Sequence, residues 1–252
     1  MSLFIETSSL YLARISPLFL APSLLPIAKL PSTVKIILSV SIAMLLAYTI
    51  GAESYVFSVS HLDYGIKLMQ EFIIGIGLVF GIQVTLAAVL FAGKTIDLQL
   101  GFGVASVLDP MTQSHEALIG SLLNSLFTVA FFTLDLHHLL VLGIANTFQS
   151  FPIGSGLALP NLTHLLSFFS GQFVLGMMVV MPVLLGLFLL DLVIAFTSRT
   201  MPQVNVYFVS LPLKIFMGLL VLSISLKYAS GFIERILSNS ILGWFSGFEV
   251  YL

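Results

Sequence analysis

The chain contains no cysteine and very few charged side chains. Without cysteine there are no disulfides, no thiolate metal sites and no cysteine nucleophile. Charged residues make up 8% of the 252 residues, whereas a soluble domain carries roughly 25%. Between Asp135 and Asp191 there is no Asp, Glu, Lys or Arg. Such a stretch is stable where hydrocarbon or other apolar protein replaces water, so the sequence indicates an integral membrane protein.

Hydrophobic residues take the place of the missing charged residues. Apolar residues make up 58% of the chain, and the mean hydropathy is +1.13. The net charge is only −2, without a basic patch or an acidic tail, so nucleic acid is not an expected partner. The first apolar stretch follows Glu6 and has no basic residues before it, which favours a retained helix over a cleaved signal peptide.

The apolar stretches predict an all-α membrane protein that forms one helical domain over residues 1–252. Short connections separate successive runs, and prolines or glycines interrupt several of them. A long helix is expected to begin near Asp63, because Asp63 and Lys67 stand four apart with the acid first. The expected runs are 10–25, 34–50, 63–100, 117–134, 139–151, 165–190, 209–226 and 228–248.

Two features predict that these helices pack against other subunits. Gly77 with Gly81, and Gly243 with Gly247, have the spacing that lets helices approach closely, and neither pair has an evident partner within the chain. Prolines and breaker segments also fall within the apolar runs. Irregular backbone survives in a membrane only when it is buried in protein or lines water. We therefore expect that the chain does not fold stably alone.

The charges at the ends of the apolar runs are expected to be neutralised in pairs. Lys94 and Asp97 are three apart on one predicted helix, and Lys67 and Glu71 are treated in the same way. A buried Arg199 needs a partner, and Asp191 lies about two turns upstream. Arg199, Gln203 and Asn205 surround Pro202 in a polar junction, so we expect them to serve assembly.

The residues do not predict an enzyme or a cofactor site. Adjacent histidines on a helix point about 100° apart, so His137 and His138 are poorly placed to hold one metal ion together. No nucleophile elbow, zinc-protease motif or phosphate-binding loop is present. A small-solute secondary transporter is an alternative, but no internal repeat supports it.

Three segments in order resemble a known family. The first is Lys94-Thr-Ile-Asp97-Leu-Gln-Leu-Gly101 continuing to Asp109-Pro110, and the second is His137-His138 followed by Phe148 and Phe151-Pro152-Ile-Gly154. The third is Ser198-Arg199-Thr-Met-Pro202-Gln203-Val-Asn205, then Pro212-Leu-Lys214 and Gly218. With the opening Arg14 to Pro22, Pro31 and Lys35, they resemble the FliR/SctT family of type III export-gate proteins over nearly the whole chain.

The sequence departs from the family pattern at two places. Asp135-Leu136 stands where relatives usually have a Gly-rich or Asn-Gly pair before the histidines, which bears on the helix geometry there. Val104 and Val107 stand where relatives often have aromatic residues, which bears on how tightly that loop seals.

The resemblance implies a subunit of the export gate in the bacterial inner membrane, partly above the bilayer plane. It implies an architecture like one FliP joined to one FliQ, in a helical channel with FliP-like and FliQ-like subunits. FlhB-like and FlhA-like proteins would lie next to that channel, and unfolded export substrates would pass through it. The flagellar branch is favoured by the Pro202 to Gly218 segment, and an injectisome subunit is the alternative.

The loop after Gly101 is the candidate channel plug, because its glycines and its Asp-Pro favour non-helical backbone and its apolar side chains can close a narrow pore to water. A simple helix connection is the alternative. The plug residues are Gly101, Phe102, Gly103, Val104, Val107, Leu108, Asp109, Pro110 and Met111. The candidate assembly residues are Lys94, Asp97, His137, His138, Pro152, Arg199, Pro202, Gln203, Asn205, Pro212 and Lys214.

Overall fold

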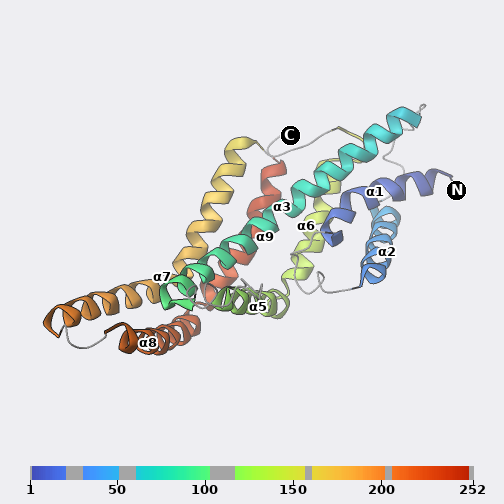
Figure 1. Ribbon diagram of the computed structural model, residues 1–252. Coiled ribbons are helices and arrows are strands. Elements are labelled where there is room, and N and C mark those ends of the chain that lie inside the picture. The colour runs from blue at the N-terminus through green and yellow to red at the C-terminus, as the bar shows by residue number, and fades with distance from the viewer. Residues whose placement is uncertain are drawn as a thin grey trace. The chain divides into compact units, whose positions relative to one another are not determined.

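All regular structure in the described part of the chain is α-helical, as the sequence predicted (Figure 1). The structure is a computed structural model, and it describes residues 2–20, 31–50, 61–102, 117–156, 161–201 and 206–249. The helices are α1 (Ser2–Leu20), α2 (Ser32–Ile50), α3 (His61–Leu100), α5 (Leu118–Thr133), α6 (Leu136–Ser150), α7 (Leu162–Thr200), α8 (Val206–Tyr228) and α9 (Ser230–Glu249).

The predicted long third helix is confirmed. α3 has 40 residues, and the Lys67 ammonium lies 3.2 Å from the Asp63 carboxylate in its first turns. An acid in the first turn suits the positive end of the helix dipole. α8 and α9 are divided at Ala229, two residues after Lys227, the residue between the last two expected runs. The largest revision concerns α7, whose 39 residues continue well past the expected end at residue 190.

Prolines lie inside three of the helices without ending them. Pro17, Pro182 and Pro212 are in α1, α7 and α8 respectively. A proline inside a helix removes one backbone hydrogen bond and its ring crowds the preceding turn, so it bends a helix that it does not end. Figure 1 shows α7 changing direction part-way along its length, and α7 contains Pro182.

The chain divides into two compact units, each with helices that pack on one another. Unit 1 comprises Met1–Val84, Phe131–Phe169 and Leu237–Leu252, and unit 2 comprises Thr85–Ala130 and Ser170–Ile236. α3, α5, α7 and α9 each contribute residues to both units. The sequence-based expectation of one helical domain over residues 1–252 stays a prediction.

In unit 1, the Gly77/Gly81 face of α3 packs against Trp244 of α9. A Cβ atom on Gly81 would overlap the indole ring, and the indole N–H donates to the Gly77 carbonyl at 2.9 Å. Trp244 is fully buried. The glycine pair therefore makes room for an aromatic side chain of the same protein. Our expectation that this face has no partner within the chain was wrong, because a flat ring fills the space that a second helix backbone was expected to fill.

In unit 2, glycines bring helix backbones into direct contact. A Cβ atom on Gly93 of α3 would overlap the backbone of Gly120 in α5. One on Gly176 of α7 would lie 3.2 Å from the Ala88 carbonyl oxygen. Apolar residues of the same helices, such as Val180, Val183 and Leu187, are buried around these contacts. Close backbone approach at small residues is the usual way in which helices associate in membranes.

α5 and α6 are separated by a break at Leu134 and Asp135. Asp135 takes a left-handed backbone conformation with φ 55° and ψ 23°. Glycine adopts this conformation without strain, and aspartate and asparagine tolerate it better than other residues do. The departure from the family pattern at Asp135 thus keeps a residue type that suits the turn.

Four of the described helices are long and apolar enough to cross a membrane. The candidate spans are Ser32–Thr49, Leu62–Leu100, Leu162–Thr200 and Ser210–Tyr228, and the broken α5–α6 pair would make a fifth. At 1.5 Å per residue, the 39 residues of α7 extend about 58 Å along the helix path, roughly twice the hydrocarbon thickness of a bilayer. A single bilayer therefore leaves part of this apolar helix outside its hydrocarbon.

We expect Gly93→Ala to destabilise the protein, because the added methyl group meets the backbone of Gly120, which has no side chain to move aside. The measurement is the temperature at which the detergent-extracted protein loses its size-exclusion peak. Gly171→Ala is the matched control, since a Cβ atom there meets nothing within 4 Å and alanine gains up to about 1 kcal/mol of helix propensity. Equal stabilities of the two variants would contradict the close contact.

Candidate functional site

A fully buried ion pair joins two helices of unit 1. Arg14 of α1 donates its Nε hydrogen to Glu71 of α3, with 2.5 Å between Nε and Oε2. The two side chains are 0% and 1% exposed. Neither charge could be buried alone, because desolvating an ion costs several kcal/mol unless a partner compensates it. The local backbone supports the approach, since Gly75 leaves the space that the Arg14 carbonyl occupies.

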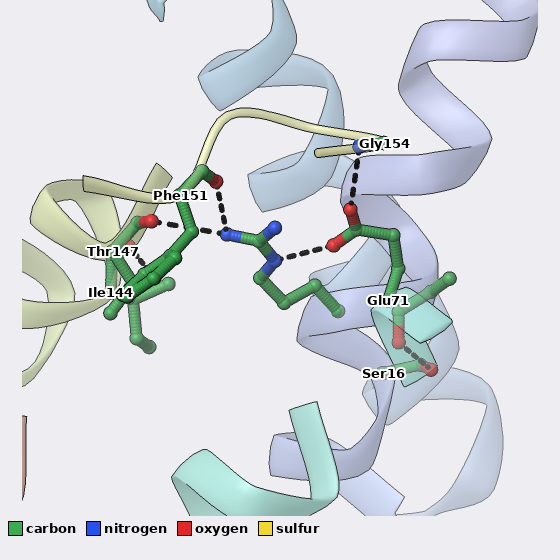
Figure 2. Close-up of polar contacts among 8 residues, drawn as sticks. Ser16, Glu71, Ile144, Thr147, Phe151 and Gly154 are labelled. Carbon is green, nitrogen blue, oxygen red and sulfur yellow. Dashed lines mark hydrogen bonds and ion pairs between the residues drawn. The ribbon is translucent and has the colours of Figure 1, made fainter. Parts of the chain in front are cut away.

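Backbone groups at the end of α6 complete this ion pair. The Arg14 Nη1 donates to the carbonyl oxygens of Thr147 at 3.2 Å and Phe151 at 3.0 Å. The Thr147 carbonyl also accepts the N–H of Phe151 at 2.9 Å, so the guanidinium is its second donor, and Phe151 is the residue just after the helix. Glu71 Oε1 accepts the N–H of Gly154 at 3.0 Å. Figure 2 shows Glu71 directed at Gly154, with the Thr147 and Phe151 carbonyls across from it.

One aromatic ring lies against the guanidinium, and a second ring packs on the first. Its Cζ lies 4.4 Å from the ring centroid of Phe148, and the Tyr11 ring is 4.6 Å from the same ring. A cation over an aromatic face gains roughly 2 kcal/mol when desolvated. Burial raises the pKa of the Tyr11 phenol above its ordinary value, and the positive charge of Arg14 acts against this shift. The result is a polar network sealed from water at the junction of α1, α3 and α6.

A second buried carboxylate caps a helix in unit 2. Asp97 of α3 accepts the N–H of Ile119 at 3.0 and 3.1 Å, and that of Gly120 at 3.4 Å. These are among the first N–H groups of α5, which lack partners within the helix and carry the positive end of its dipole. The expected ion pair between Lys94 and Asp97 was wrong, because both carboxylate oxygens are directed at the start of α5.

The remaining expected pairs are also revised. Glu71 binds Arg14 and Lys67 binds Asp63, so the Lys67–Glu71 pairing was wrong. Asp191 of α7 forms an ion pair with Lys214 of α8. The expectation of a buried Arg199 paired with Asp191 was wrong as well, since Arg199 is exposed in the last turn of α7. Spacing in the sequence predicts only ion pairs within one helix, whereas Glu71 and Asp191 each pair with a residue of another helix.

Most of the candidate plug lies outside the described residues. Gly103, Val104, Val107, Leu108, Asp109, Pro110 and Met111 are not described. Gly101 and Phe102 are half-buried, and Gly101 has φ +86°, a left-handed conformation that ends α3 as glycine commonly does. The flanks of the loop lie close together, since Asp97 before it binds Ile119 after it.

The other candidate assembly residues belong to several elements of the chain. Pro152 lies in the turn after α6, beside the carbonyl that Arg14 binds. Pro212 is inside α8, two residues before Lys214. Pro202, Gln203 and Asn205 lie outside the described residues. The described candidates are divided between the two units, with His137, His138 and Pro152 in unit 1 and the others in unit 2.

The rings of His137 and His138 lie 4.1 Å apart between centroids, although adjacent helical residues were expected to point away from each other, and Asp135 lies beside them. One ligand atom of each of these three residues lies within 4.8 Å of the others. The cause is the left-handed turn at Asp135, which places its side chain beside the first residues of α6. His138 and Asp135 are mostly exposed, with 3.9 Å between Nδ1 and Oδ1.

The sequence reasoning missed the role of Glu71 with Arg14 and of the backbone around them. One feature of the sequence could have indicated their role. Both charges stand within apolar stretches, and ionisable groups at such positions rarely lack a partner. What the sequence could not give is the pairing, since 57 positions separate the two residues. The roles of the Thr147 and Phe151 carbonyls cannot be recognised from the sequence, because every residue has a backbone carbonyl.

The chain is similar to known proteins over nearly its whole length. The model of the family described as bacterial export proteins, family 1, matches residues 5–240. The flagellar biosynthetic protein FliR of Bacillus subtilis is 31% identical over 184 residues, covering 71% of this chain and 70% of that protein. FliR of Escherichia coli is 28% identical over 231 residues, covering 90% and 87%. FliR of Aquifex aeolicus is 28% identical over 225 residues, covering 88% and 84%.

We expect Glu71→Gln to destabilise the protein by about 3–5 kcal/mol, because it leaves the Arg14 charge buried without a counter-charge. The measurement is resistance of the detergent-extracted protein to heat and to protease. Asp63→Asn is the control, since it removes the acid of the partly exposed Asp63–Lys67 pair, whose contribution is at most about 1 kcal/mol. A Glu71→Gln protein as stable as Asp63→Asn would contradict the assigned role of the buried pair.

Proposed function

The chain belongs to family 1 of the bacterial export proteins, and on that premise we propose that it is a core subunit of the flagellar type III protein export gate. In this role it forms part of the channel for unfolded flagellar substrates together with FliP-like and FliQ-like subunits. FlhB-like and FlhA-like proteins are its further partners. Its place is the inner membrane of the flagellar basal body, partly above the bilayer plane.

The observation that carries the proposal is the amount of apolar helix that the chain leaves uncovered. α7 is far longer than a bilayer is thick, and only 28% of its candidate span is buried within the protein. Large apolar side chains stand out along its second half, including Phe188, Val193 and Phe196. Lipid can cover only part of such a helix, so neighbouring subunits would cover the rest.

The similarities favour the flagellar branch and a gate subunit over the alternatives. Each relative named above is a flagellar biosynthetic protein, which supports a flagellar role over an injectisome role. A family described as export proteins also supports protein export over transport of small solutes. The buried carboxylates Glu71 and Asp97 bind Arg14 and the backbone at the start of α5, which suits a structural role.

The segment after Gly101 is proposed as the channel plug. The residues on either side of this segment lie close together, because Asp97 of α3 binds the N–H of Ile119 at the start of α5. The loop sequence is rich in apolar and glycine residues. Apolar side chains in a narrow pore exclude water and ions while no substrate is present.

Co-purification tests the proposed role. A gate subunit extracted in mild detergent should bring FliP-like and FliQ-like chains with it in a fixed ratio. The same tagged protein expressed without these partners should lose its discrete size-exclusion peak, because the exposed face of α7 then has no protein to cover it. A protein that purifies alone as a monodisperse, protease-resistant monomer would contradict the gate proposal and favour the transporter.

A second experiment tests the plug. Deleting Val104 to Leu108, or replacing Val104, Val107 and Leu108 by serine, should raise ion leakage across the membrane, because polar or missing side chains let water enter the pore. Replacing the same three residues by methionine is the control, since it keeps an apolar closure. Conductance equal to that of the unmodified complex in the serine variant, with assembly intact, would contradict a plug at this loop.

A further inference from the structure

Asp135, His137 and His138 form a compact group at the break between α5 and α6. One carboxylate oxygen of Asp135 and one ring nitrogen of each histidine lie within 4.8 Å of one another. Nδ1 of His138 lies 3.9 Å from Oδ1 of Asp135. All three residues belong to unit 1, so the group lies entirely within one compact unit and is distinct from the buried ion pair of Arg14 and Glu71.

The backbone at the break brings these side chains together. A regular helix turns adjacent residues about 100° apart, which separates two neighbouring imidazoles. The ring centroids of His137 and His138 are nevertheless 4.1 Å apart, and the ring of Phe132 lies 5.6 Å from that of His137. Asp135, with φ 55°, joins them from the turn before α6. Two imidazoles and a carboxylate therefore converge from four consecutive positions of the chain.

The distances in this group fit a divalent metal ion after small movements of the side chains. Zn²⁺ binds imidazole nitrogens and carboxylate oxygens at about 2.0–2.2 Å, which places the ligand atoms of a tetrahedral site about 3.4 Å apart. Ligand atoms that are 4.8 Å apart or less reach this spacing by moving together by about 1.4 Å at most. The side chains of His138 and Asp135 are 72% and 75% exposed, so they can turn about their χ angles with little hindrance.

The chemistry of the group favours a transition metal. Imidazole ligands suit Zn²⁺ and its neighbours in the first row, whereas Mg²⁺ and Ca²⁺ take oxygen ligands. Nδ1 of His137 is buried without a hydrogen-bond partner among the described residues, and a bound ion is one of the causes of such unpaired atoms. Three protein ligands leave the fourth position of a tetrahedral site to water.

We propose that Asp135, His137 and His138 bind one Zn²⁺ ion, with water in the fourth position. The ion ties the carboxylate of Asp135, in the turn, to the two imidazoles in the first turn of α6. It thereby holds the left-handed backbone at the break in place. The site does not depend on the export function, since it rests on the local geometry of unit 1 alone.

Metal titration of the assembled complex tests the site. The complex is purified with a tag that contains no histidine, stripped with a chelator, dialysed and titrated with Co²⁺, whose visible absorption reports coordination, and Zn²⁺ then displaces the Co²⁺. Asp135→Asn and His138→Ala should each weaken Zn²⁺ binding by at least about tenfold, because losing even a group behind a metal ligand costs about 10–100-fold. Asparagine also tolerates the left-handed backbone at position 135.

Matched variants at the start of α3 are the controls. Asp63→Asn and His61→Ala remove the same two residue types outside the group, and both should bind Zn²⁺ as tightly as the unmodified complex. Because partner chains are the same in every sample, the difference between the two sets of variants reports the site in this chain.

A second measurement needs no variant. Diethylpyrocarbonate modifies exposed imidazoles, and the modified histidines of the unmodified complex are mapped by mass spectrometry with and without Zn²⁺. His138, whose side chain is mostly exposed, should react in the stripped complex and be protected by saturating Zn²⁺.

Three results would overturn the proposal. The first is a stripped complex in which Co²⁺ gives no absorption band. The second is Zn²⁺ binding that Asp135→Asn and His138→Ala leave as tight as in the unmodified complex, since the ion would then lie elsewhere. The third is modification of His138 that saturating Zn²⁺ leaves unchanged.

Discussion

The buried pair of Arg14 and Glu71 is the constraint on which the arrangement of unit 1 depends. Two charges removed from water must stay together, and each also needs partners for its remaining hydrogen-bonding positions. The backbone at the end of α6 and in the turn after it supplies three of them, the carbonyls of Thr147 and Phe151 and the N–H of Gly154, while Arg14 Nη2 has no partner among the described residues. This network fixes the positions of three helices at once, in a molecule whose other contacts are mostly non-directional apolar packing.

In unit 2, two glycines and one carboxylate fix the position of α3 against α5. Its helices approach until backbone touches backbone at Gly93 and Gly120, and the Asp97 carboxylate binds the N–H groups exposed at that crossing. Apolar packing alone gives helices in a membrane little reason to choose one neighbour over another, because lipid tails are equally apolar. A carboxylate with two specific donors, placed beside a contact that only glycine permits, defines one register of α3 against α5.

The helices could be predicted from the sequence, but the partners of the buried charged residues could not. Apolar runs and breakers located each described helix, since a membrane leaves a helix as the only way to satisfy the backbone of an uncharged run. The ordered motifs also pointed to the family. The partners of Glu71, Asp97 and Asp191 were missed because spacing on one helix reveals only neighbours on that helix. The glycine face at Gly77 and Gly81 was found, but a distant tryptophan, not a second glycine face, occupies it.

The contact of Trp244 with α3 gives this protein an optical property. The chain has a single tryptophan, and its ring is fully buried in unit 1 against Gly81, Phe80 and Phe168. Intrinsic indole emission therefore comes from one location, where α9 meets α3. Any event that separates these two helices exposes the ring to a new environment and changes its emission. The protein thus contains a native fluorophore that follows one of its two units without a label.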